Sequence, residues 1–119
     1  MIEHNNMGES LNEFSHKTKN ADQSWVLAIG GDLRKIDIIR EFWQSAIELI
    51  DLKPPALWIN FTSVQFADTK LAACIIAILR RADIQGIHVY IVGSSAVQDV
   101  LSLCKVPPLK YFTETTKAA

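Results

Sequence analysis

The sequence lacks an excess of positive charge, a long apolar run and a dense set of cysteines. Its 119 residues include 12 lysines and arginines against 13 aspartates and glutamates, for a formal net charge of -1. Binding to nucleic acid or to an anionic membrane usually needs a basic footprint, which is missing here. No apolar run approaches the roughly 20 residues of a membrane span, and the start of the chain is neither basic nor apolar. We therefore expect no signal peptide, no nucleic-acid partner and no direct membrane insertion.

The spacings that metal binding or redox chemistry would need are also missing. Cys74 and Cys104 do not form a Cys-x-x-Cys pair, and both fall in apolar helical patterns typical of small buried side chains in a reducing compartment. His4, His16 and His88 lack the spacing of metal ligands. We therefore expect a cytoplasmic protein with no metal and no cofactor.

Motifs typical of enzymes are missing as well. Gly30 and Gly31 follow an apolar run, but neither the Gly-x-Gly-x-x-Gly nor the phosphate-loop spacing is present, so a tight turn explains the pair more simply. No set of nucleophile, base and orienting residue can be assembled from the sequence. The sequence predicts a protein that is not an enzyme.

What the sequence does contain is the pattern of a single α/β domain. With 49% hydrophobic residues the chain is large enough for one core and too small for two. Short apolar runs alternate with segments of helical periodicity, which indicates a mostly parallel sheet with helices packed on it. The expected strands are Trp25–Ile29, Leu57–Phe61 and His88–Val92, and the expected helices run from Ile36 to Ile50, from Thr69 to the residues before Gly86, and from Ser95 to Cys104.

Turns and caps are expected between these elements. The first strand is predicted to close at Gly30-Gly31-Asp32 and the second at Phe61, where a short polar turn follows. Gly86 suits the position after a helix end, where positive φ is favourable for glycine. Ser95, with Gln98 three residues later, has the spacing of a capping box.

The two ends of the chain are expected to lie outside the domain. Residues 1–24 are polar and aperiodic, and we interpret them as a flexible arm with at most one short edge strand around residues 12–17. Residues 25–112 form the predicted domain, in which residues 109–112 add a short terminal strand or helix. Residues 113–119 are predicted to be a disordered tail.

The candidate functional site is the turn between the second expected strand and the helix after it. In open α/β sheets, ligands and partners bind where strands end and helices begin, and a helix N-terminus offers unpaired N–H groups. Asp68 and Thr69 are both preferred N-cap residues, so capping alone would explain them. Alternatively, Thr69 is exposed where a phosphate, adding roughly −1.5 to −2 charges, would be electrostatically favourable. Asp32, after the neighbouring strand, either lines the same surface or serves as a turn residue.

These pieces together resemble the STAS domain, which is shared by anti-sigma-factor antagonists and sulfate transporters. The matching segments are residues 27–33, residues 59–69 with Phe-x-Asp-Thr at their end, and residues 86–93. The resemblance covers about residues 25 to 112. It implies a non-enzymatic module, a single α/β domain with a mostly parallel four- to five-stranded sheet and helices packed on it.

The resemblance also implies a site. In anti-sigma-factor antagonists, the Ser or Thr after that Asp is phosphorylated by a kinase that is itself the anti-sigma factor, and the unphosphorylated form captures the kinase. Carried onto this chain, the phosphoacceptor is Thr69. The residues implied to contact the partner are Asp32, Asp68, Thr69, Lys70 and Ala73.

The chain departs from the family pattern at two places. A small residue and a glycine usually follow the Asp-Ser/Thr pair, whereas Lys70 and Leu71 stand here. This implies a different partner face or a lost switch. An aspartate is also common in the family where Asn60 stands.

Two functions remain open on this resemblance. One is a partner switch that binds a kinase-type anti-sigma factor. The other is the small STAS subunit of an ABC complex that moves phospholipid between bacterial membranes, bound to the transporter ATPase. That branch favours Thr at position 69, an aromatic residue such as Trp43, and a proline near Pro107. A small-molecule sensor is a third idea, for which the sequence offers no pocket signal.

Overall fold

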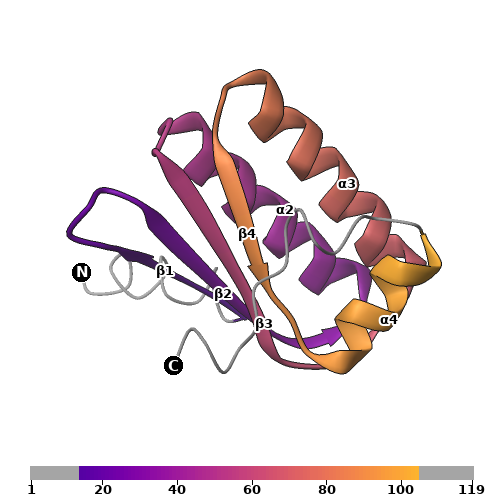
Figure 1. Ribbon diagram of the computed structural model, residues 1–119. Helices are drawn as coiled ribbons and strands as arrows, with labels where there is room; N and C mark the ends of the chain where they lie inside the picture. Colours follow the sequence, from indigo (N-terminus) through magenta and orange to yellow (C-terminus); the bar gives the residue numbers. More distant parts are fainter. Residues whose placement is uncertain (1–13, 105–119) are drawn as a thin grey trace, which may run out of the picture.

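Strands and helices alternate through residues 14–104, the part of the chain that the computed structural model describes (Figure 1). In chain order the elements are β1 (Ser15–Lys19), β2 (Trp25–Leu33), α2 (Ile36–Asp51), β3 (Ala56–Ala67), α3 (Thr69–Ile84), β4 (His88–Val92) and α4 (Ser95–Leu103). The strands form one sheet in the order β1-β2-β3-β4, with β1 antiparallel to β2 and the other pairs parallel. The predicted α/β class with a mostly parallel sheet is confirmed.

One core lies between the sheet and the helices. Helices α2 and α3 pack side by side, and α4 lies against α3 and β3 (Figure 1). From Ala56 to Phe61 of β3, half-buried and fully buried side chains alternate, as expected where one face of a sheet packs on the core. Phe42 of α2 meets Phe61 of β3 edge to face, with ring centroids 5.4 Å apart, and both side chains are fully buried.

The helix ends follow local sequence chemistry in most places. Gly86 adopts a φ of 73°, and the N–H groups of Gly86 and Ile87 donate to the carbonyls of Asp83 and Ala82, which is a Schellman motif. The expected role of Gly86 is therefore confirmed. The expected capping box at Ser95 is wrong by one residue, because the Ser94 hydroxyl accepts the cap hydrogen bond, from the Val97 N–H.

Strands β2 and β3 are longer than the sequence predicts. Gly30, Gly31 and Asp32 do not close β2, which continues to Leu33, and the polar residues after Phe61 remain in β3. The two strands pair in parallel almost to their ends, with register shifts around the two glycines. The predicted turns are wrong because pairing with the neighbouring strand satisfies this backbone, while one face of the extension is open to solvent and accepts polar side chains.

Strand β1 lies in the region that the sequence assigns to the arm. The short edge strand expected around residues 12–17 is present at Ser15–Lys19, paired with β2 from Ser15 opposite Ile29 to Lys19 opposite Trp25. The Glu41 carboxylate of α2 accepts hydrogen bonds from the Phe14 N–H and the Ser15 hydroxyl, each at 2.9 Å. The fold therefore begins before Trp25.

The remaining predictions for the chain ends fall on residues 1–13 and 105–119. These include most of the arm, the terminal element at residues 109–112, and the tail. They lie outside the described residues and stay predictions.

Candidate functional site

The parallel register brings the ends of β2 and β3 to one edge of the sheet. Asp32 pairs with Phe66, and Leu33 pairs with Ala67. Helix α3 begins two residues after Ala67, at Thr69. Asp32 and the Asp68-Thr69 turn therefore lie at the same edge, which is one of the two roles that the sequence allows for Asp32, even though 36 positions separate Asp32 from Asp68 along the chain.

Asp68 is the N-cap of α3. Its carboxylate accepts hydrogen bonds from the Lys70 N–H at 3.0 Å and from the Lys70 ammonium at 2.6 Å. Hydrogen bonding to Lys70 lowers the pKa of the Asp68 carboxyl from its ordinary value, although burial acts in the opposite direction. Capping, which is the simpler explanation of this residue, is thus what the geometry shows.

The other predicted contact residues of α3 face the solvent. Thr69 is the first residue of the helix, and the side chains of Thr69, Lys70 and Ala73 are exposed. Leu71, by contrast, is fully buried in the core. The departure of Leu71 from the family pattern therefore changes the packing beneath the surface, and Lys70 alone changes the surface itself.

Asp32 is held by a residue that sequence reasoning missed. Arg34 donates to the Asp32 carboxylate from its backbone N–H at 3.0 Å and from Nε and Nη2 at 2.8 Å each. The side-chain fork of Arg34 is the main cause that lowers the pKa of the Asp32 carboxyl to about 2. Hydrogen bonding to Asp32 raises the pKa of the Arg34 guanidinium, and the charge of Asp68 adds to this effect in the same direction.

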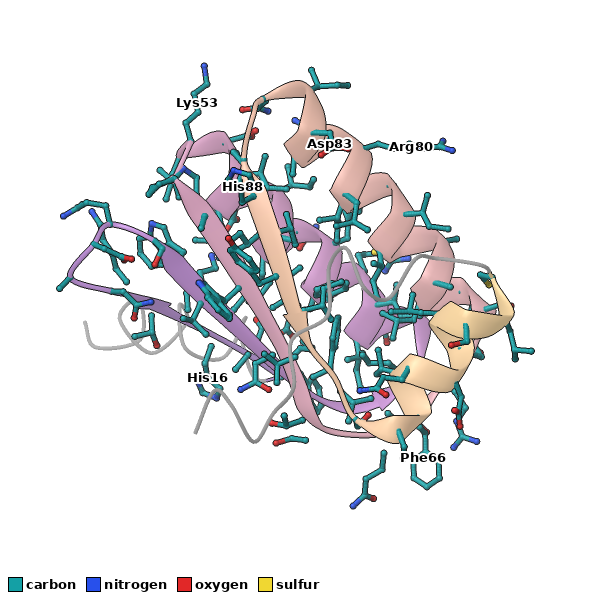
Figure 2. All side chains as sticks on the ribbon, viewed as in Figure 1. His16, Lys53, Phe66, Arg80, Asp83 and His88 are labelled. Carbon is teal, nitrogen blue, oxygen red and sulfur yellow. The ribbon has the colours of Figure 1, made fainter. Side chains whose placement is uncertain are left out.

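Phe66 completes this surface and was also missed. The Arg34 guanidinium lies over the Phe66 ring, 4.4 Å from its centroid. Phe66 is 48% exposed, and its ring points away from the molecule (Figure 2). The signal in the sequence was a large aromatic residue on the exposed side of an extended strand. It could be used only once the strand was known to continue past Phe61.

The fork on Asp32 predicts an acid-sensitive contribution to stability. A carboxyl with a lower pKa in the folded chain stabilises the fold above the ordinary pKa of 3.8, and this contribution is lost as the pH falls toward about 2. We expect Arg34→Gln to raise the Asp32 pKa toward 3.8, measured by NMR titration of carboxyl carbons. Asp22, whose carboxylate is bound by Ser24, serves as the control in the same spectra. An unchanged Asp32 pKa would contradict the role of Arg34.

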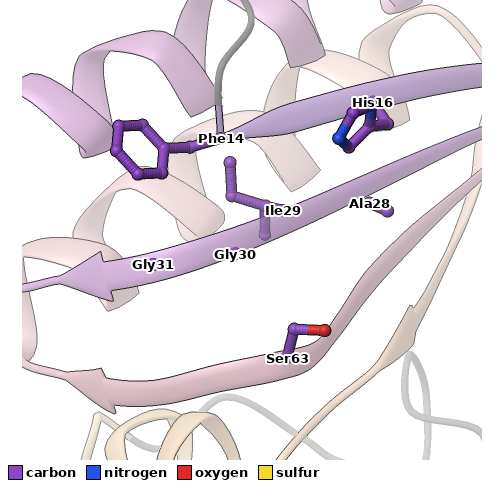
Figure 3. A pocket seen from close by; sticks show the side chains of 7 residues that line it. All are labelled: Phe14, His16, Ala28, Ile29, Gly30, Gly31 and Ser63. Carbon is purple, nitrogen blue, oxygen red and sulfur yellow. The ribbon is translucent and has the colours of Figure 1, made fainter.

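A separate hollow lies on the sheet near the start of β1 (Figure 3). It encloses about 350 Å³, and its lining residues are Phe14, His16, Ala28, Ile29, Gly30, Gly31 and Ser63. It includes none of the predicted contact residues, and it lies on the sheet surface rather than in the apolar interior. It therefore gives no support to a sensor that uses the core.

Three further findings on the described residues concern metal binding, thiol chemistry and membrane spans. Within residues 14–104, no three side chains of the His, Cys, Asp and Glu types gather as metal ligands would. Burial raises the pKa of the Cys74 thiol to about 12, so its reactive thiolate is disfavoured near neutral pH. In the same range, no helix combines the length and the apolarity needed to cross a membrane.

The sequence matches no protein-family model and no curated protein. The structure does match solved structures. An anti-sigma factor antagonist from Mycobacterium paratuberculosis gives a TM-score of 0.76 at 14% identity, over 87% of this chain and 87% of that one. The anti-sigma factor antagonist SpoIIAA matches in its unphosphorylated form with a TM-score of 0.72 at 13% identity, over 87% of this chain and 90% of that one.

Two further matches are of the same kind. SpoIIAA of Bacillus in its phosphorylated form gives a TM-score of 0.69 at 12% identity, covering 87% of this chain and 93% of that one. A serine-to-glutamate variant of RsbS from Moorella thermoacetica gives a TM-score of 0.70 at 20% identity, covering 85% of this chain and 86% of that one. The chain has the STAS fold. The resemblance drawn from the sequence is confirmed at the level of the fold, since anti-sigma-factor antagonists are STAS-domain proteins.

Proposed function

We propose that this STAS domain is a non-enzymatic partner switch of the anti-sigma-factor-antagonist type. Its contact surface is the edge formed by Asp32, Asp68, Thr69, Lys70 and Ala73. Its partner is a kinase-type anti-sigma factor, which phosphorylates Thr69 and is then released.

The observation that carries this proposal is the position of Thr69. Its side chain is exposed at the first position of a long helix, directly after a capping aspartate and next to a second acidic residue on the neighbouring strand. A phosphate there lies at the positive end of the helix dipole, so it changes the charge of the surface without unfolding the helix. The fold is shared with SpoIIAA, which has been solved both with and without phosphate.

The test is binding of Thr69→Glu to the kinase-type anti-sigma factors of the host organism, each purified and measured by biolayer interferometry. The added charge is expected to weaken binding at least about tenfold, because like charges placed across an interface are strongly unfavourable.

Incubation of the wild type with the kinase and ATP should place a phosphate on Thr69, detected by mass spectrometry, and Thr69→Ala should stay unmodified.

Thr18→Glu is the matched control. Thr18 is exposed on β1 and pairs with Val26 near the start of β2, so this variant makes the same substitution away from the edge where β2 ends at Asp32 and Leu33. It should bind like the wild type, and both variants should keep the wild-type circular dichroism spectrum. Equal binding of Thr69→Glu and the wild type to every kinase would count against a phosphorylation switch.

One observation favours a second candidate, the small subunit of an ABC-type phospholipid transport complex. The Lys70 ammonium already neutralises the Asp68 carboxylate at the helix N-terminus. A surface whose charges are already paired favours a permanent contact with a partner, and such a contact does not require phosphorylation of Thr69. Stable co-purification with a transporter ATPase, unaffected by Thr69→Glu and without phosphate on Thr69, would support this candidate over the partner switch.

A further inference from the structure

We propose that Arg34 and Phe66, held together by Asp32, form the anchor by which the partner is recognised, and that the partner presents an apolar recess rimmed by carboxylates. This inference rests on the proposed partner-binding function. It adds two residues that the family resemblance does not supply, and it states the chemistry of the opposing surface.

The three side chains are already fixed in the unbound chain. Asp32 holds the Arg34 guanidinium through two side-chain hydrogen bonds of 2.8 Å, and the guanidinium lies over the Phe66 ring at 4.4 Å. Asp32 and Phe66 are paired across β2 and β3, so the backbone of the sheet sets their separation. A partner that binds this stack has little side-chain freedom to remove, which favours affinity.

Residue type and position together single out Phe66, the one aromatic side chain among the large exposed hydrophobics of residues 14–104. Five large hydrophobic side chains of residues 14–104 are substantially exposed, and they are Ile36, Leu52, Phe66, Ile84 and Leu103. Phe66 lies two positions before the Asp68 cap, whereas Leu52 and Ile84 lie at or just beyond the opposite ends of α2 and α3. Aromatic and arginine side chains dominate binding energy at protein interfaces, and Phe66 and Arg34 are such a pair at the proposed site.

The charge of the surface indicates the partner's chemistry. Arg34, Lys35 and Lys70 contribute three positive charges, and Asp32 and Asp68 contribute two negative ones. Arg34 and Lys70 are paired with the aspartates, while Lys35 is exposed and makes no ion pair within residues 14–104. The positive excess around an exposed ring fits carboxylates placed around an apolar recess, because complementary charge steers association and selects the partner.

The experiment measures the Kd of each purified kinase-type anti-sigma factor for the wild type and three variants. Phe66→Ala is expected to weaken binding about 30-fold, the typical loss at an interface hot spot. Arg34→Gln should weaken it about tenfold by releasing the stack. Lys35→Glu reverses a charge beside the stack of Asp32, Arg34 and Phe66 without changing the stack itself. Its effect on the Kd therefore shows whether the opposing surface of the partner is negative or positive. This variant should weaken binding to a carboxylate-rimmed surface, and added salt should weaken wild-type binding.

Matched controls are available far from the site. Ile84→Ala removes a large apolar side chain that is even more exposed than Phe66, from the last residue of α3. Arg80→Gln removes an exposed arginine on the same helix, well away from Phe66 (Figure 2). Both should bind within about twofold of the wild type, and thermal melts should show that all variants remain folded.

The outcomes separate this inference from the proposed function. Loss of binding in Thr69→Glu with wild-type affinity in Phe66→Ala would overturn the anchor and leave the partner switch standing. Tighter binding of Lys35→Glu would overturn the carboxylate-rimmed partner. Failure of the wild type to bind any of the kinases would overturn both proposals.

Discussion

Replacing Phe61 with alanine is expected to lower the free energy of unfolding by roughly 3–5 kcal/mol, the usual loss for a buried aromatic residue. Phe61 is fully buried, lies in the middle of β3, and packs edge to face on Phe42 of α2. Its removal leaves a cavity between sheet and helix and also ends the contact of the two rings. A domain of this size has roughly 5–15 kcal/mol of stability in total, so the loss is a large fraction of it.

Urea denaturation followed by circular dichroism measures this effect. Phe66→Ala in the same strand is the control, because Phe66 is half exposed and most surface substitutions change stability by about 0.5 kcal/mol or less. The two variants therefore distinguish a residue of the core from a residue of the proposed anchor. Phe61→Ala should lose stability, and Phe66→Ala should lose binding. Similar stabilities for the two variants would contradict the placement of Phe61 in the core.

Gly31→Ala is expected to destabilise the domain by roughly 2–4 kcal/mol, as the sum of a backbone and a packing cost. Gly31 has a φ of 95°, which disfavours any side chain, and it lies at a register shift between β2 and β3. A Cβ atom there would approach the Phe14 ring to 2.9 Å and Ile38 Cδ1 to 3.2 Å. Because Asp32 follows directly, the strain would also reach the residue that holds Arg34.

Two other glycines provide controls for the separate causes. Gly86 also has a positive φ, but nothing lies within 4 Å of a Cβ atom added there. Gly86→Ala should therefore lower the free energy of unfolding by about 1 kcal/mol, from the backbone alone. Gly30→Ala meets only Ser63 Cβ at an ordinary 3.8 Å and should be nearly neutral. Thermal unfolding of the three variants ranks them. A larger loss for Gly86→Ala than for Gly31→Ala would contradict the close packing around Gly31.

Much of the fold could be predicted because its signals are local. Helix α2 follows directly from its apolar periodicity, and Asp68 and Gly86 cap the two ends of α3 by chemistry that involves only a few neighbouring residues. For Asp32 the sequence offers two roles, a place on the same surface as Asp68 or a turn residue, and the strand register puts it at the shared edge. The helix and its two caps depend on residue type and spacing alone.

The errors occurred where distant segments pair. Gly30 to Asp32 were expected to form a turn, since glycine pairs usually do, but pairing with β3 keeps them in β2. Strand β1, expected only as a short edge strand of the arm, belongs to the domain because β2 and the Glu41 carboxylate hold it. Ser63, opposite Gly30, and Glu41, which accepts from the Phe14 N–H, are both distant in the sequence from the residues they hold.

The sequence by itself determined the α/β class, the helices and the capped turn that precedes Thr69, because periodicity and capping act over a few residues. The tertiary structure alone decided the stack of Asp32, Arg34 and Phe66. Phe66 is 32 positions away from Arg34, and the contact exists only because the register of two parallel strands places Asp32 opposite Phe66. The surface that we propose as the partner's anchor is thus a property of strand pairing, which depends on the whole sheet and not on any local segment.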